Sequence, residues 1–260
     1  MGWLELPIGD YSPDPASVGH QSPLNGGIAW DAAVGGWVPT DPQYVSPDGT
    51  DYVAPISSST VDIVDARTRA AVSKTPTKSR YINAVIAYTQ TAIYLVATGE
   101  SPPPGLWKID TSSWKLSQVS AARIAWDVVN GAAAWGTAES PDSLSSVERL
   151  DLSTGVVTKV GPASKTFQYV AGFVGSGVLV VPDGGRFSAA RVINPNGASQ
   201  SVQVPEALIG ALVGPSALQD GLDLLFASNV GLVVYDPNRG LETVVSPPAL
   251  ARVLGPCTAA

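Results

Sequence analysis

The chain has 260 residues, of which 45% are apolar and 14% charged, and its formal net charge is −7. This composition excludes a disordered chain, and an acidic surface repels phosphate groups, so we expect no nucleic-acid partner. No apolar run reaches the roughly 18 residues of a membrane-spanning helix. We therefore expect no transmembrane segment. Residues 1–7 lack a basic stretch and an apolar stretch, so any export signal is expected to precede them.

Six hairpin patterns recur along the chain. In each pattern a β-rich run ends in Asp or Asn, a few turn residues follow, and a second β-rich run begins. Asp and Asn favour such turns because their side chains accept hydrogen bonds from backbone amides two residues later. The markers lie 34 to 45 residues apart, about the length of a propeller blade; they are Asp31, Asp65, Asp110, Asp151, Asn194 and Asp236.

Further apolar runs precede the later hairpins, for example residues 81–88 and 92–97 before Asp110. Apolar residues on both faces are typical of strands packed between neighbouring sheets, and no segment shows a helical apolar stripe. With four strands per unit, the pattern predicts an all-β fold. We expect one domain over residues 1–260, a six-bladed β-propeller with four-stranded antiparallel blades.

The two ends of the chain are expected to close this ring. The first hairpin, at residues 28–38, has a single β-rich run before it, near residues 3–7. The missing innermost strand is best supplied by residues 252–257, because a closed ring leaves no unpaired sheet edge. This segment includes Cys257, the only cysteine, which excludes an internal disulfide.

Residues 44–54 read Tyr-Val-Ser-Pro-Asp-Gly-Thr-Asp-Tyr-Val-Ala. This stretch resembles the SPDG strand–turn–strand unit of TolB-like, WD40-like bacterial propellers, and the Trp30-Asp31 and Gly36–Pro39 region before it resembles the preceding blade of secreted or lipid-anchored propellers. The resemblance implies a propeller fold and an extracytoplasmic location, whether periplasmic, cell-surface or secreted. It implies no active site, because these proteins share a scaffold and not a chemistry.

Residues for metal or acid–base chemistry are scarce. His20 is the only histidine and lies in a loop-like stretch, while a zinc site usually needs two or three His or Cys ligands. No Gly-x-Ser-x-Gly motif supports a nucleophilic serine. We therefore expect no catalytic residue, no metal ligand and no cofactor. A central-channel Ca²⁺ is the alternative, with oxygen ligands to be sought at Asp48, Asn83, Asp127 and Asp220.

Basic and aromatic residues recur where the chain leads into the first strand of a unit. On a propeller these positions share one face and would form a ring around the channel mouth. Such a ring would bind carboxylate or sulfate groups through arginine, and sugar or peptide faces on its aromatic rings. The alternative is that basic side chains cover apolar strand ends. The predicted ring comprises Arg80, Tyr81, Arg123, Trp126, Lys165, Phe167, Tyr169 and Arg252.

Four of the seven tryptophans recur beside the hairpin turns, at Trp30, Trp37, Trp107 and Trp114, whereas Trp126 and Trp135 are placed to approach the channel and the blade face instead. The repeated placement favours packing between sheets over ligand binding.

Three functions fit these observations. The first is a non-catalytic binding or scaffold propeller that engages a glycan, peptide or protein partner through the loop face. The second is a channel-site enzyme, lactonase- or lyase-like, with a divalent cation. The third is a structural subunit of an envelope assembly, which a large exposed apolar patch would favour. The first hypothesis is preferred because it requires no chemistry that the sequence lacks.

Overall fold

The computed structural model describes residues 2–5, 10–22, 27–54, 60–76, 82–97, 105–139, 144–182, 189–208, 213–220, 223–228 and 231–245. The described secondary structure is almost entirely β-strand. Three short 3₁₀ helices accompany the strands: η1 (Pro15–Ser17), η2 (Pro42–Tyr44) and η4 (Glu206–Leu208). Within these ranges, no helix is long and apolar enough to cross a membrane.

Four sheets contain four antiparallel strands each, in simple up-and-down order. The first contains β8 (Ile82–Tyr88), β9 (Ala92–Ala97), β10 (Gly105–Asp110) and β11 (Leu116–Ser120). The second contains β12 (Ala125–Val129), β13 (Ala133–Glu139), β14 (Ser145–Asp151) and β15 (Val157–Ser164). The third contains β16 (Gln168–Val174), β17 (Gly177–Pro182), β18 (Arg191–Ile193) and β19 (Ser199–Ser201). The fourth contains β20 (Val213–Asp220), β21 (Asp223–Ser228), β22 (Gly231–Asp236) and β23 (Gly240–Val245).

The N-terminal part of the chain forms smaller sheets. Strands β5 (Asp51–Val53), β6 (Thr60–Asp65) and β7 (Ala71–Pro76) form a three-stranded sheet. A single bridge from Val45 to Tyr52 takes the place of its first strand. Strand β3 (Ala29–Asp31) pairs with β4 (Gly36–Val38), and β1 (Gly2–Glu5) pairs with β2 (Asp10–Pro13).

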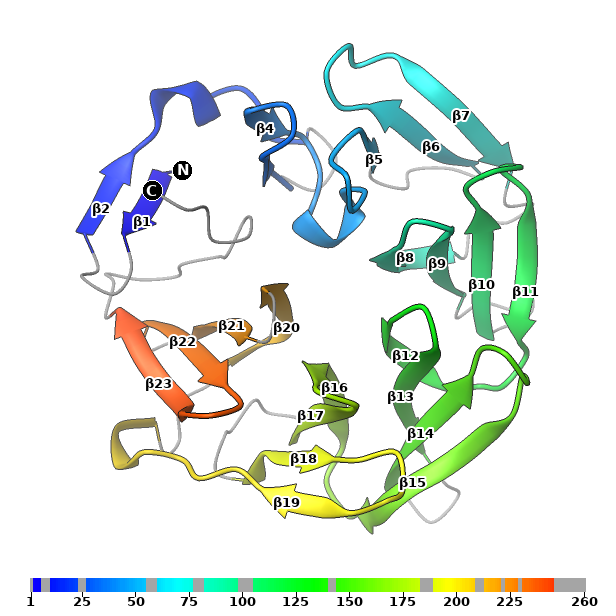
Figure 1. Ribbon diagram of the computed structural model, residues 1–260, viewed down its shortest axis with the longest axis vertical. Helices are drawn as coiled ribbons and strands as arrows, with labels where there is room; N and C mark the ends of the chain where they lie inside the picture. Colours follow the sequence, from blue (N-terminus) through cyan, green and yellow to red (C-terminus); the bar gives the residue numbers. More distant parts are fainter. Residues whose placement is uncertain are drawn as a thin grey trace.

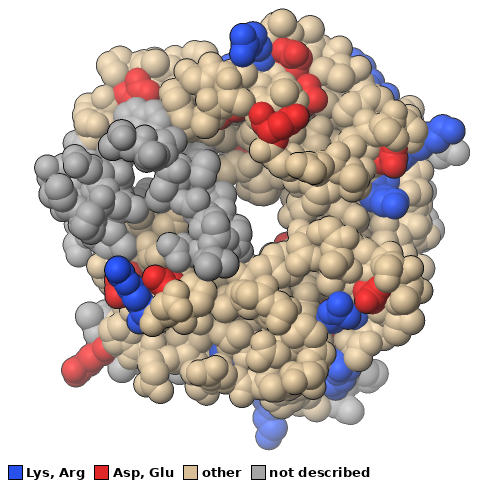
Figure 2. All heavy atoms as spheres, viewed as in Figure 1, with Lys and Arg blue, Asp and Glu red and all other residues tan. Residues whose placement is uncertain are grey.

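The sheets follow one another around a ring, each with its first strand toward the centre, as Figure 1 shows for β8, β12, β16 and β20. A central opening is visible in the space-filling view (Figure 2). This arrangement of four-stranded antiparallel sheets is that of a β-propeller.

The core lies between neighbouring sheets. In one cluster, Ile63 of β6 packs with Ile93 of β9 and Ile109 of β10. In another, Trp135 of β13 packs with Val178 of β17 and Ile193 of β18. A sheet between two neighbours therefore buries side chains on both faces, and all six residues of its second strand β9 are buried.

The six predicted markers all lie at hairpin turns, which the structure places between the last two strands of a sheet. Asp110 shows how they work, because one carboxylate oxygen accepts hydrogen bonds from the backbone N–H groups and hydroxyls of Ser112 and Ser113. These bonds lower the Asp110 pKa to about 2, with the hydroxyls of Ser112 and Ser113 contributing most. Local hydrogen bonding within the turn thus explains the repeated Asp.

The N-terminal region differs from the expected single strand before the first hairpin. Two strands, β1 and β2, precede it, and they pair with each other in a sheet separate from β3–β4. No marker indicated this extra pair, because β1 ends in Glu5 and not in Asp or Asn. Residues 252–257, on which the predicted closure depends, lie outside the described residues.

Candidate functional site

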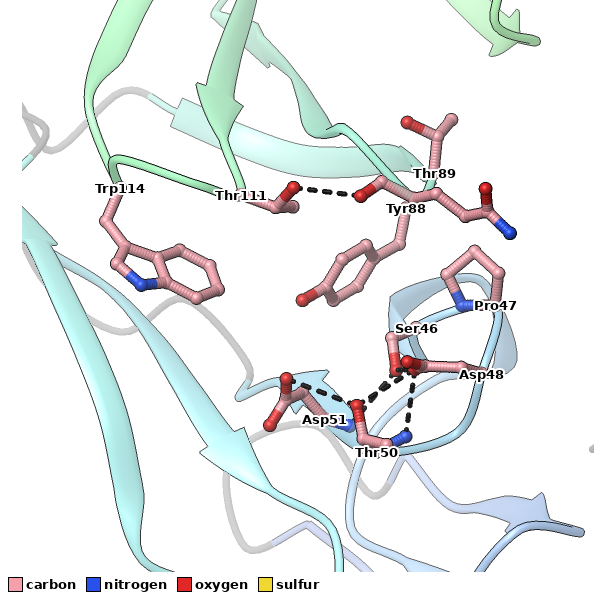
Figure 3. A pocket seen from close by; sticks show the side chains of 10 residues that line it. Ser46, Pro47, Asp48, Thr50, Asp51, Tyr88, Thr89, Thr111 and Trp114 are labelled. Carbon is pink, nitrogen blue, oxygen red and sulfur yellow. Dashed lines mark hydrogen bonds between the residues drawn. The ribbon is translucent and has the colours of Figure 1, made fainter.

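A pocket of about 260 Å³ opens between the sheet β5–β7 and the sheet β8–β11 (Figure 3). Three turns meet there: the SPDG turn before β5, the β8–β9 turn and the β10–β11 turn. In an up-and-down sheet the first and third turns lie at the same end, so all three belong to one face of the ring. The lining residues are Ser46, Pro47, Asp48, Thr50, Asp51, Tyr88, Thr89, Gln90, Thr111 and Trp114.

Hydrogen bonds to the Asp48 carboxylate stabilise the SPDG turn. One oxygen of this carboxylate accepts hydrogen bonds from the Ser46 hydroxyl at 2.8 Å, the Thr50 N–H at 3.1 Å and the Thr50 hydroxyl at 2.9 Å. The Thr50 N–H bond contributes most to lowering the Asp48 pKa, followed by the Ser46 hydroxyl. Asp48 therefore stays ionised beside the pocket.

Gly49 allows this turn to approach the neighbouring hairpin. Its φ of +68° is in the left-handed region, and a Cβ placed on it would lie 2.4 Å from Asp31 Oδ1. Asp31 is 2% exposed, and its Oδ2 has no hydrogen-bond partner within the described residues. Burial is the main reason that the Asp31 pKa is raised. The buried Asp31 carboxyl thus lies directly against the SPDG turn at Gly49.

The opposite wall of the pocket comes from β8 and the turns that follow it. The Thr111 hydroxyl donates to the Gln90 carbonyl at 2.9 Å, which ties the β10–β11 turn to the β8–β9 turn. Tyr88 is half-buried, and its ring faces the pocket opposite the SPDG turn (Figure 3). Burial, and then the nearby carboxylates of Asp51 and Asp48, raise the Tyr88 pKa, so its hydroxyl remains protonated.

Trp114 completes the pocket in an unusual backbone conformation, with φ +54°. The corresponding positive-φ position, four residues after the marker Asp, is glycine in three other hairpins: Gly35, Gly155 and Gly240. A bulky side chain in this conformation costs about 1–2 kcal/mol. Part of the Trp114 side chain packs on the core cluster between the two sheets, and it also lines the pocket. The strained position is therefore occupied by the residue that forms the aromatic wall.

Among the residues that the structure describes, Arg69 is the other non-glycine residue with positive φ, at 62°, in the β6–β7 turn of the adjacent sheet. It donates to the Trp37 carbonyl at 2.7 Å, and its guanidinium lies 5.7 Å from the centre of the Tyr52 ring. Arg69 thereby joins the β3–β4 and β5–β7 sheets. Both exceptions to glycine at this turn position make contacts beyond their own hairpin.

The negative charge of the pocket is concentrated at Asp51 and Asp48. Burial raises the Asp51 pKa, and the carboxylates of Asp65 and Asp48 raise it further. Figure 2 shows acidic side chains gathered over β5 and the β6–β7 hairpin. The described residues that line the pocket include no Lys, Arg or His.

The described residues of the predicted basic and aromatic ring lie in or just before β12 and β16, at the strand ends opposite the pocket. Arg123 and Lys165 are exposed, and Phe167 is 40% exposed. Trp126, in contrast, is 2% exposed in the core between two sheets, and Tyr169 is half-buried against another core cluster. Arg80, Tyr81 and Arg252 lie outside the described residues. Two of the predicted aromatic contacts thus belong to the packing between sheets.

The residues considered for a central-channel cation belong to different elements. Asp48 is in the SPDG turn, Asn83 in β8, Asp127 in β12 and Asp220 at the end of β20. No group of three or more His, Cys, Asp or Glu side chains suited to a metal ion occurs within the described ranges. His20 is exposed in a loop after η1.

The prediction that tryptophans beside the hairpin turns pack between sheets is confirmed for Trp107 and Trp114, which pack on the core cluster between two sheets, while Trp37 is 4% exposed. Trp126 and Trp135, for which the channel and the blade face were the alternative, are buried in the core at 2% and 1% exposed. Trp30 meets Trp37 edge-on, with ring centres 5.3 Å apart. Sequence reasoning missed the pocket because it grouped Trp114 with the packing residues. The available signal was a tryptophan where other marked turns have glycine.

No family model and no curated protein matches the sequence. Solved structures do resemble the fold. An acylaminoacyl peptidase from Pyrococcus horikoshii aligns with a TM-score of 0.53 and 15% identity over 77% of this chain, but only 38% of the peptidase chain. Hydrazine synthase from Kuenenia stuttgartiensis aligns with a TM-score of 0.51 and 13% identity, covering 78% of this chain and 66% of the synthase chain. BamB from Moraxella catarrhalis aligns less well, with a TM-score of 0.40 and 14% identity over 73% of this chain and 70% of BamB.

This chain therefore spans less than two thirds of the peptidase and about two thirds of the synthase. At such low identities the likeness concerns the fold alone, since one scaffold supports many unrelated functions.

Proposed function

We propose that this chain is a non-catalytic binding or scaffold propeller that engages a protein, peptide or glycan partner, and that the pocket beside Trp114 is its contact site. Trp114 carries this proposal. It occupies a turn position where three other hairpins have glycine, and the same side chain walls a pocket. Strained residues persist where their surroundings hold them and they often mark functional sites.

The residues that line the pocket favour ligand recognition over catalysis. It combines two aromatic side chains, Tyr88 and Trp114, with carboxylates and hydroxyls at its rim. Aromatic side chains provide rigid contact area at interfaces, and polar groups around them fix the orientation of the ligand. The face opposite, with Arg123, Lys165 and Phe167 exposed, is the second candidate surface.

The location and the blade count are part of the same proposal. The SPDG resemblance supports an extracytoplasmic protein, and the six marked hairpins support six blades. For six blades to hold, the pairs β1–β2 and β3–β4 must supply the four strands of one blade, so residues 252–257 would close the ring as a fifth strand beside them.

The test is binding of the purified protein to peptide and glycan arrays, followed by titration of each hit. Trp114→Gly removes the aromatic wall and relieves the backbone, whereas Trp114→Phe keeps a ring. The double variant Arg123→Ala, Lys165→Ala removes cations from the opposite face and serves as the matched control. The proposal expects hits that are lost with glycine, retained with phenylalanine and unaffected by the control.

Hits that depend on Arg123 and Lys165, and not on Trp114, would move the contact site to the opposite face. Turnover of a lactone or glycoside substrate that requires an added divalent cation would replace the binding role with the enzymatic one. Circular dichroism of each variant verifies that a lost hit is not a lost fold.

A further inference from the structure

We infer that the pocket binds a positively charged side chain, arginine or lysine, presented by a partner polypeptide. The inference rests on the proposed function and names the chemistry of its ligand. It follows from the charge, the aromatic walls and the size of the pocket.

The charge of the pocket is negative and unbalanced. Asp48 and Asp51 both line it, and neither forms an ion pair within the described part of the chain. Arg69, on the adjacent hairpin, is engaged with the Trp37 carbonyl and the Tyr52 ring. A cation bound between the carboxylates would relieve the repulsion between them.

The aromatic walls suit the same ligand. Figure 3 shows the Tyr88 and Trp114 side chains on either side of an open space, with Asp51 at its edge and Asp48 beyond Tyr88 in the SPDG turn; both carboxylates line the pocket. A guanidinium or ammonium group near the face of a tryptophan or tyrosine ring is attracted by the ring quadrupole. Charged hydrogen bonds to the carboxylates would add direction. An anionic or uronic-acid ligand would instead be repelled by both carboxylates.

The size of the pocket favours one side chain over an extended oligomer. Its volume of about 260 Å³ is below the roughly 300–1,000 Å³ typical of drug-sized ligands. The SPDG turn that forms one wall is held by the three hydrogen bonds to Asp48. The pocket is therefore pre-formed on that side, and a partner loses little binding energy in ordering it.

The experiment follows Trp fluorescence and calorimetric heat while the protein is titrated with blocked peptides of sequence Gly-Arg-Gly, Gly-Lys-Gly and Gly-citrulline-Gly. Citrulline has nearly the shape of arginine without its charge. Asp51→Asn removes one pocket charge and keeps the shape, and Asp151→Asn removes one charge from a distant turn as the matched control. We expect the arginine peptide to bind more tightly than the citrulline peptide. Asp51→Asn should weaken arginine binding by about tenfold, and Asp151→Asn should leave it unchanged.

Acid should weaken binding of the arginine peptide, because protonated Asp51 no longer attracts a cation. The Asp51 pKa is raised, so this loss should begin at a higher pH than for an ordinary aspartate, and Asp51→Asn should abolish that part of the profile.

Equal affinity for arginine and citrulline peptides, or an unchanged affinity in Asp51→Asn, would overturn the inference. If array hits depend on Trp114 but carry no basic residue, the proposed function stands and this inference fails. If no hit depends on Trp114, both fail. Saturable binding of Ca²⁺ that displaces the arginine peptide and requires Asp51 would also overturn it, in favour of a metal ion.

Discussion

Asp127 Oδ2 accepts a hydrogen bond of 2.9 Å from the backbone N–H of Val170. Asp127 lies on β12 and Val170 on β16, so this bond joins the first strands of two successive sheets. Both strands have register shifts here, between Trp126 and Val128 and between Val170 and Gly172. Such irregularities redirect side chains and free backbone groups, and here they allow one sheet to bond to the next beside the ring centre.

The Asp127 carboxyl should make stability depend on pH. Burial raises its pKa to about 7 from an ordinary 3.8, with the Val170 N–H acting in the opposite direction. Because the folded state holds the proton more tightly, this group favours folding at low pH and loses that contribution as pH rises from about 4 to about 7. Asp127→Asn keeps an acceptor for Val170 and should be more stable than the native chain at pH 8, by at most about 4 kcal/mol.

Urea unfolding at pH 4, 6 and 8 measures this difference. Asp127→Ala, which leaves the Val170 N–H without an acceptor, should be less stable than Asp127→Asn at every pH. An Asp127→Asn variant that shows the same pH profile as the native chain would contradict the assignment.

Gly49 should tolerate no side chain. In Gly49→Ala the new Cβ would meet Asp31 Oδ1 at 2.4 Å and the Ala33 Cβ at 2.6 Å, in a backbone conformation that already disfavours alanine. Asp31 cannot easily give way, because it is buried and its Oδ1 accepts the Ala33 N–H at 2.9 Å. We expect a loss of about 2–4 kcal/mol.

Gly155→Ala is the control for this substitution, because Gly155 has a similar φ of +73° with no neighbouring atom within 4 Å of its added Cβ. It should cost only about 1 kcal/mol. Thermal unfolding of the two variants separates the cost of backbone strain from the cost of the Cβ contact with Asp31. Equal losses of stability in the two variants would show that Gly49 is needed for its φ alone.

The hairpin markers should contribute to acid unfolding. Hydrogen bonds within the turns lower the pKa of Asp110 and of Asp151 to about 2, the largest contributions coming from the Ser112 and Ser153 hydroxyls respectively. Their stabilisation is present above about pH 4 and is lost as pH falls toward 2. Between pH 4 and pH 2 the melting temperature of the double variant Asp110→Asn, Asp151→Asn should therefore fall by less than that of the native chain. A melting temperature that falls equally in both proteins refutes this role.

Deletion of residues 252–260 tests the predicted closure of the ring. If residues 252–257 provide an innermost strand, their loss exposes a sheet edge and should abolish the cooperative thermal transition seen by circular dichroism. Deletion of 258–260 alone should leave the transition in place. An unchanged melting temperature in the longer deletion would place ring closure elsewhere.

The sequence by itself determined the features whose causes are local. The Asp-to-glycine hairpins were predictable because a marker such as Asp151 bonds to the backbone of Ser153 and Thr154 within its own turn. The first and second strands were also predictable, because strands covered on both faces are rich in apolar residues. These signals predicted the sheets and their antiparallel order. They did not predict β2 or its pairing with β1, because β1 ends in Glu5 and not in an Asp or Asn marker.

Only the tertiary structure decided which side chains meet. Trp126 and Phe167 each lie a few residues after a basic residue in the sequence. In the structure Trp126 is buried between sheets, whereas Phe167 is exposed. The raised pKa of Asp127 and the pocket between Asp51, Tyr88 and Trp114 arise from residues far apart in the chain. Burial and electric fields depend on distances in space, and sequence spacing sets those distances only within a single hairpin.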